Sequence, residues 1–247
     1  MKHGITLIEL SMVLVIVALL VGGVVMGRDM IWAANMRSAL AQIDEYKTAS
    51  HAFKIKYGCL PGDCVRATTF LTGTANGDGN HRIGGPLFTS VESHLFWQHL
   101  ALAGLMSGNY STSAPAPGNQ YVAGVNFPHS KIGDRGGFGV AYFGDYNHGT
   151  AIGGGWVFPA QYDNALMLGR AWSDTTSRVP LHPTLTGSEA LQVDTKVDDG
   201  RPAYGKVVSW RSGNYSGTCL TSSVATSAFY NTLNSTVRCS LFFTNAF

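Results

Sequence analysis

The first 28 residues constrain the fold of this chain more than any other segment. Residues 5–27 are predominantly apolar and carry one ionisable side chain, Glu9, and the charged residue Arg28 ends the run. A bilayer core about 30 Å thick needs about 20 helical residues, so this run is long enough to span a membrane. Because a charge inside such a segment is costly, Glu9 is a candidate functional residue.

Two simpler explanations of this segment stay open. A secretory signal peptide would need a longer basic region, an apolar stretch of about 7 to 15 residues and a small-x-small cleavage site, and the segment fits none of these well. A plain single-pass anchor accounts for the length and for Lys2 on the cytoplasmic side, but not for Gly4 or Glu9. A carboxylate this close to the end of an anchor could still reach the interface.

Residues 4–10, which read Gly-Ile-Thr-Leu-Ile-Glu-Leu, resemble the class III leader junction of type IV pilins and type II secretion pseudopilins. In that family a prepilin peptidase cuts after the glycine and methylates the new amino terminus, and a glutamate stands at the fifth mature position. The resemblance implies cleavage after Gly4, N-methylation of Ile5 and an assembly role for Glu9. The family usually begins its mature chain with Phe, whereas Ile5 keeps only the apolar character.

Three later segments resemble pilin-like proteins with large periplasmic domains, a subgroup to which a minor pilin would belong. These segments are residues 53–63, 97–105 and 194–200. The resemblance implies a pilin-like α+β fold, in which a long N-terminal helix packs on a small antiparallel β-sheet.

The helical pattern continues beyond Arg28, because apolar residues recur at steps of three and four, and no proline interrupts residues 5–60. The recurring positions are Met36, Leu40, Ile43, Tyr46 or Lys47, Ala49, Phe53 and Tyr57. We therefore expect one helix over residues 5–57, about 80 Å long. Its stripe over residues 35–57 should pack on the chain's own domain, whereas the N-terminal half needs other copies to cover it once it leaves the bilayer.

Four segments follow from this interpretation: a leader at residues 1–4, a membrane and assembly helix at 5–27, an amphipathic helix at 28–57 and an extracytoplasmic domain at 58–247. The last segment holds about 190 residues, enough for one sizeable core. Within it we expect a helix from Thr89 to Ser107, begun by the capping box Thr89-x-x-Glu92. Strands are expected at 138–143, 156–158, 165–172, 204–210 and 237–243.

The four cysteines form two local pairs by sequence, Cys59 with Cys64 and Cys219 with Cys239. This spacing favours two local disulfides, which an oxidising periplasm would permit. Zinc binding by the four thiolates is the less favoured alternative, because the Cys-x4-Cys spacing is not that of a usual zinc hook. All three disulfide connectivities stay formally open.

The sequence offers little for catalysis or for nucleic-acid binding. It has no Gly-x-Ser-x-Gly, no His-Glu-x-x-His and no phosphate loop, so we do not expect an enzyme. His94 and His99 are five apart, which places them on different helix faces, and we expect His99 to be a hydrogen-bonded core residue. The 17 basic residues nearly balance the 15 acidic ones, so no nucleic-acid partner is indicated.

Calcium is the one cofactor for which the sequence offers candidate ligands. Oxygen side chains alternate at Asn76, Asp78 and Asn80, as in the start of a calcium loop, but His81 breaks the EF-hand pattern. A Gly/Asn turn explains this segment more simply. A second acidic group holds Asp194, Asp198 and Asp199. The family resemblance adds that some pseudopilins hold calcium in their carboxy-terminal loops.

These observations predict a structural subunit of a type IV filament, either a minor pilin or a pseudopilin. Its partners would be other pilin subunits, the prepilin peptidase and methyltransferase, the assembly machinery and membrane lipid. It would sit in the bacterial inner membrane with its amino terminus cytoplasmic and its domain periplasmic. In the family, Glu9 is expected to meet the freed amine of Ile5 on a neighbour. The alternative is a binding module or enzyme that a pilin-like anchor tethers without assembly.

Overall fold

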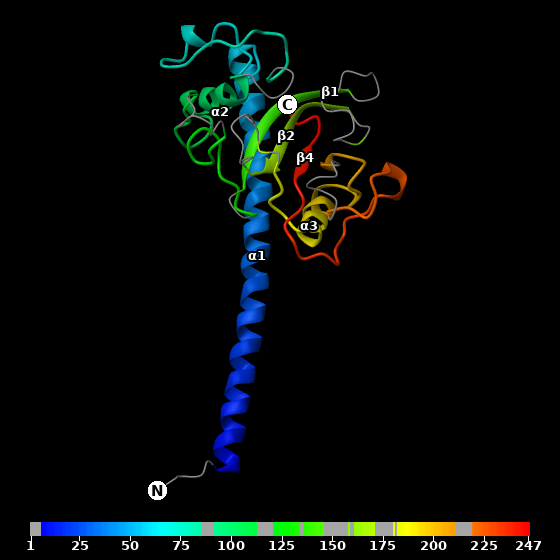
Figure 1. The fold of residues 1–247 in the computed structure, drawn as a ribbon. Coiled ribbons are helices and arrows are strands. Elements are labelled where there is room, and N and C mark those ends of the chain that lie inside the picture. Colours follow the sequence, from blue (N-terminus) through cyan, green and yellow to red (C-terminus); the bar gives the residue numbers. More distant parts are fainter. Residues whose placement is uncertain are drawn as a thin grey trace.

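The computed structural model describes residues 6–84, 91–112, 121–133, 136–145, 158, 161–170, 180, 182–210 and 219–247. Its α-helices are α1 (Leu7–Tyr57), α2 (Glu92–Leu102) and α3 (Gly187–Val197), and 3-10 turns cover Ala67–Thr69 and Ala225–Ser227. Its strands are β1 (Gly137–Asp145), β2 (Gln161–Gly169), β3 (Val207–Ser209) and β4 (Leu241–Phe243). In Figure 1, α1 forms a long stalk, and the other elements gather around its C-terminal half. The fold is α+β, as the sequence predicts.

Helix α1 has 51 residues and is therefore about 76 Å long. It begins at a capping box, in which the Thr6 side chain and the Glu9 side chain each accept from the backbone of the other. It ends at Gly58, which adopts a left-handed conformation with φ 74° and donates its N–H to the Lys54 carbonyl. The predicted end at residue 57 is confirmed, whereas the helix begins at Leu7, because Thr6 is the extended N-cap; residue 5 lies outside the described residues.

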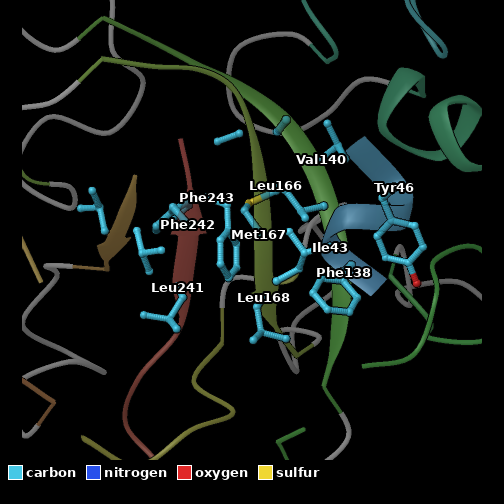
Figure 2. Packing of buried hydrophobic residues seen from close by; sticks show 14 of the residues in the cluster. Ile43, Tyr46, Phe138, Val140, Leu166, Met167, Leu168, Leu241, Phe242 and Phe243 are labelled. Carbon is cyan, nitrogen blue, oxygen red and sulfur yellow. The ribbon is translucent and has the colours of Figure 1, made fainter. Parts of the chain in front are cut away.

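The core lies where one face of α1 meets the sheet. The buried positions on α1 are spaced mainly three and four residues apart, namely Met36, Ala39, Ile43, Tyr46, Ala49, Ser50 and Phe53. Figure 2 shows Ile43 and Tyr46 beside Phe138 of β1, with the side chains of β2 and β4 behind them. The Tyr46 ring meets Phe138 edge-on at 5.4 Å and Trp97 of α2 at 4.9 Å. The amphipathic half of α1 thus packs on its own domain, as expected.

The four strands form one antiparallel sheet in the order β1-β2-β4-β3. The expected strand at 138–143 falls within β1, whereas β2 begins at Gln161, four residues before the predicted 165. β3 and β4 are three residues each, shorter than predicted, because only these residues pair across the sheet. Of the expected strand at 156–158, residues 156–157 lie outside the described residues, and Phe158 is not in a strand.

The two shorter helices differ from the sequence prediction. α2 ends at Leu102 rather than Ser107, because Gly104 takes φ 68° and closes a Schellman motif, in which the N–H of Leu105 donates to the Leu100 carbonyl at 3.0 Å. The predicted cap Thr89 lies outside the described residues, and the structure has Val91 at the N-cap, so the predicted capping box with Glu92 at its third helical position is wrong. α3 was not predicted, although Thr186-x-x-Glu189 is a capping box that could have revealed it.

Candidate functional site

The N-terminal half of α1 is an apolar surface that the rest of the chain does not cover. The large hydrophobic side chains from Leu7 to Ile31 are all exposed, with Val17 at 49% and Leu7 at 89%. The first buried position on α1 is Met36, at 3%. An apolar surface of this extent needs either lipid or protein around it.

Within the described residues, α1 is the one helix that is long and apolar enough to cross a membrane, and its most apolar window has a mean hydropathy of 2.7. Residues 7–27 rise by about 30 Å, which equals the thickness of a bilayer core. The window is not buried inside the protein, unlike the core helix of a soluble domain. A single N-terminal membrane anchor fits these properties.

Glu9 lies in the first turn of this exposed helix. Its Oε2 accepts from the Thr6 backbone N–H at 2.9 Å and from the Thr6 hydroxyl at 2.8 Å. The Glu9 N–H in turn donates to the Thr6 hydroxyl oxygen at 3.3 Å. The sequence analysis missed this capping role, although the spacing Thr6-x-x-Glu9 signals it.

The hydrogen bonds of Glu9 leave half of its carboxylate available. Both bonds from Thr6 end on Oε2, and among the described residues none donates to Oε1. A carboxylate can accept about four hydrogen bonds, so Oε1 remains open to a cationic donor from outside the chain. Gly4 and Ile5, the predicted cleavage and methylation sites, lie outside the described residues.

Both expected disulfides are present. Cys59 bonds to Cys64 with a Cα–Cα distance of 5.3 Å, and Cys219 bonds to Cys239 with 5.2 Å. The first fixes the turn that follows α1, and the second closes the loop between residues 219 and 239. No described cysteine is free, so these four are not thiolate ligands for zinc.

The first predicted calcium segment forms a different cluster from the one expected. Asp78 joins it with two acidic residues that were not among the predicted ligands, Asp63 and Glu92, and the Asn80 amide donates to the Asp78 carboxylate at 2.8 Å. Their carboxylate oxygens lie within 4.8 Å of one another. Asn76 instead accepts from the Thr68 N–H, and Asn80 accepts from the Arg82 N–H, so both asparagines fix local turns.

Backbone donors already satisfy the two buried carboxylates of this cluster. Asp63 accepts from three consecutive backbone N–H groups, those of Gly79, Asn80 and His81, at 2.8, 3.0 and 2.9 Å. Glu92 accepts from the N–H groups of Asp78 and Gly84 at 3.0 and 2.9 Å. Burial nevertheless raises the pKa of both carboxyls. The cluster therefore organises the loop over residues 76–84 and fits a cation poorly.

The second predicted acidic group does come together. The carboxylates of Asp194, Asp198 and Asp199 lie within 4.8 Å of one another at the end of α3. Asp194 is fully buried and accepts from the Tyr230 hydroxyl at 2.8 Å and from the Gly200 N–H at 3.3 Å. Burial is the main cause that raises the pKa of Asp194 to about 7, and the neighbouring carboxylates raise it further.

The second group has more carboxylate oxygens free to bind calcium than the first has. Both groups consist of three carboxylates and include one exposed residue, so composition and access to solvent do not separate them. Each carboxylate also has spare lone pairs, because Asp199 accepts one bond from the Arg201 N–H and Asp198 one from the Lys206 N–H. Calcium at this group stays a prediction.

His99 lies in the core with both ring nitrogens hydrogen-bonded, as predicted. Its Nδ1 accepts from the Gly62 N–H at 2.9 Å, so the proton of the neutral ring belongs on Nε2, which lies 3.0 Å from the Ala75 carbonyl. Burial lowers the pKa of His99 and favours this neutral form. These two hydrogen bonds link His99 of α2 to the loop that follows α1.

The overall arrangement, a long apolar N-terminal helix followed by a small antiparallel sheet, is a pilin-like architecture. Comparisons of the chain with protein-family models, with curated proteins and with solved structures found no match. The geometry of α1 and the motif at residues 4–10 are therefore the features from which a function can be proposed.

Proposed function

We propose that this chain is a subunit of a type IV filament, as a minor pilin or a secretion pseudopilin. The observation that carries the proposal is the exposed apolar half of α1, with a carboxylate in its first turn. An anchor needs the apolar surface and can use Glu9 to cap α1, but it does not need the second carboxylate oxygen, Oε1, to stay open. A filament uses both, because helices that leave the bilayer must be buried against one another and must be set in register.

The mechanism is assembly rather than catalysis. After cleavage behind Gly4, Ile5 would carry a free amine, and Oε1 of Glu9 on a neighbouring subunit would accept from it. Each charge alone is costly to bury in an apolar filament core, whereas the pair neutralises both charges. The capping bonds from Thr6 hold the Glu9 side chain at the start of α1, so the carboxylate is oriented before assembly.

We place the subunit in the bacterial inner membrane, with the amino terminus cytoplasmic and the domain periplasmic. Lys2 on the short N-terminal side of the span supports this orientation, and the two disulfides support an oxidising compartment for the domain. A domain of about 190 residues is large for the repeating subunit of a thin fibre, which favours a minor position in the filament.

The test separates the charge of Glu9 from its capping role. Glu9→Gln keeps an N3 side chain that can complete the capping box but removes the charge. Thr6→Val removes the cap but keeps the carboxylate. Each full-length variant is expressed in a cell with an active prepilin peptidase, and its processed, membrane-retained and filament-incorporated fractions are measured beside those of the unaltered chain.

We expect processed Glu9→Gln to stay in the membrane and to be lost from filaments, and Thr6→Val to incorporate. Incorporation of processed Glu9→Gln at the unaltered level would refute the pairing role. A chain that never enters filaments, while substitutions in its domain abolish a binding or turnover activity, would favour the tethered module over the filament subunit.

A further inference from the structure

One edge of the domain lies beside the point where α1 leaves the apolar segment. Trp32 of α1 donates its indole N–H to the Gln192 side chain of α3 at 2.9 Å. This contact joins the first turn of α1 beyond Arg28 to the middle of α3. Figure 1 shows α3 at the side of the domain that faces the N-terminal end of α1.

The height of this contact can be estimated from the helix rise. Trp32 lies five residues beyond Gly27, the last residue of the apolar run, which places it about 7 Å above the hydrocarbon core. The headgroup layer is about 5 to 8 Å thick on each side of the bilayer. Trp32 and the part of α3 that it contacts therefore lie at headgroup level, the depth at which tryptophan is enriched in membrane proteins.

Two further residues belong to the same edge. The backbone of Asn231 lies directly against Gly187, the first residue of α3, which brings Leu233 close to that end of the helix. Leu233 is 98% exposed, the highest exposure among the large hydrophobic residues that the structure describes. The Arg238 N–H donates to the Leu185 carbonyl at 2.9 Å, and its side chain is exposed.

A groove of about 440 Å³ runs along this edge between α1 and α3. Val25 from the apolar segment lines it, together with the oppositely charged Arg28 and Asp29 and with Ser188 and the acidic Glu189 of α3. Arg28 has no ion-pair or hydrogen-bond partner among the residues that the structure describes. The groove thus begins in the apolar layer and offers one cation, two anions and a hydroxyl above it.

We propose that this edge docks the domain on the phospholipid headgroups of the leaflet from which α1 emerges. The docking edge consists of Arg28, Asp29, Trp32, Glu189, Leu233 and Arg238. The two guanidinium groups pair with lipid phosphates, and Asp29 faces the ammonium of a zwitterionic headgroup. Leu233 inserts below the phosphates, as an apolar residue at a membrane interface does.

This inference rests on the membrane span of α1 and not on filament assembly. It describes the subunit before extraction, with its domain held upright against the membrane surface. A charge-balanced edge with one inserting leucine fits a zwitterionic bilayer, so docking does not require anionic lipid. The occupant is the bilayer itself rather than a second copy of the chain.

The test measures the depth of Leu233 in the full-length protein, reconstituted in phosphatidylcholine vesicles that contain nitroxide-labelled lipids. Leu233→Cys adds one free thiol for a fluorescent label, because no described cysteine is free. Ile55→Cys is the matched control: Ile55 is apolar, 77% exposed and about 40 Å further along α1 than Arg28. We expect quenching at position 233 by shallow nitroxides, and none at position 55.

A second pair of variants excludes insertion that the label itself causes. The label is moved to Ser235→Cys, with Leu233 either unaltered or changed to Asp. We expect Leu233→Asp to abolish the quenching at position 235. Equal quenching in both variants, or none at position 233, would overturn the proposal. If protection of the label from water increases with the protein-to-lipid ratio and not with the content of nitroxide lipid, the edge contacts another copy of the chain. That result would also overturn the proposal.

Discussion

Asp194 offers a quantitative test of the domain. It is fully buried at the end of α3, where its carboxylate accepts from the Tyr230 hydroxyl and the Gly200 N–H. Asp194→Asn keeps these contacts, because the amide oxygen can accept from Gly200 while the amide nitrogen donates to the Tyr230 oxygen. The substitution removes only the charge and its repulsion by Asp198 and Asp199.

The magnitude follows from the pKa of this carboxyl, which burial raises from 3.8 to about 7. Between these values the folded state holds a proton that the unfolded state has lost, so the stability of the unaltered protein falls as pH rises from about 4 to 7. One pKa unit corresponds to about 1.4 kcal/mol, so the rise from 3.8 to about 7 corresponds to a total loss on the order of 4 kcal/mol. Asp194→Asn should therefore match the unaltered chain near pH 4 and exceed its stability by about this amount at pH 8.

The assay is urea unfolding of both full-length chains in detergent, followed by tryptophan fluorescence from pH 4 to 8. The difference between the chains isolates Asp194 from other titrating groups. A difference that does not change with pH, or an unaltered chain that is more stable than the variant at pH 8, would refute the reasoning.

Calcium can be tested in the same experiment. If calcium binds the group at the end of α3, it will raise the unfolding midpoint of the unaltered chain at pH 8 and leave that of Asp194→Asn almost unchanged. Equal shifts in both chains would place the ion elsewhere, and no shift would contradict the predicted site.

Three further outcomes are expected. The intact mass of the protein from peptidase-containing cells should show cleavage after Gly4 and one methyl group on Ile5, and a chain that keeps its first four residues would contradict the leader assignment. Replacing Cys219 and Cys239 by Ser should lower the free energy of unfolding by about 3 kcal/mol, because without the disulfide the unfolded chain gains conformational freedom. An unchanged urea midpoint would contradict this. Ile43→Ala should lower the free energy of unfolding by about 2 to 4 kcal/mol, because the side chain is buried between α1 and the sheet. A change below about 1 kcal/mol would mean that this contact is not part of the core.

The long helix was predictable from the sequence because its signals are local. An uninterrupted apolar run, the absence of proline and a stripe at helical spacing determine α1 whatever it packs against. The disulfides were predictable for the same reason, since partners close in sequence are close in space. α3 was missed even though its capping box is local, because only four of its residues, Gly187, Ala190, Val193 and Asp194, are buried.

The acidic clusters depended on tertiary contacts that no local pattern encodes. Asp63 and Glu92 are 29 positions apart, and they meet because α2 folds back on the turn after α1. The Gly-Asn run that resembled a calcium loop instead wraps its backbone N–H groups around Asp63. The residue types suggested a set of calcium ligands, but in the folded chain backbone N–H groups already donate to the Asp63 carboxylate oxygens.

The sequence by itself determined that the chain has a membrane-sized helix with a carboxylate in its first turn, because length, hydropathy and charge are properties of the residues alone. Only the tertiary structure decided where that helix first becomes fully buried, which is at Met36. It also decided that Trp32 contacts α3 and that Oε1 of Glu9 stays open. The physical reason is that burial and hydrogen bonding depend on which surfaces meet, and that is settled by packing between segments far apart in the chain.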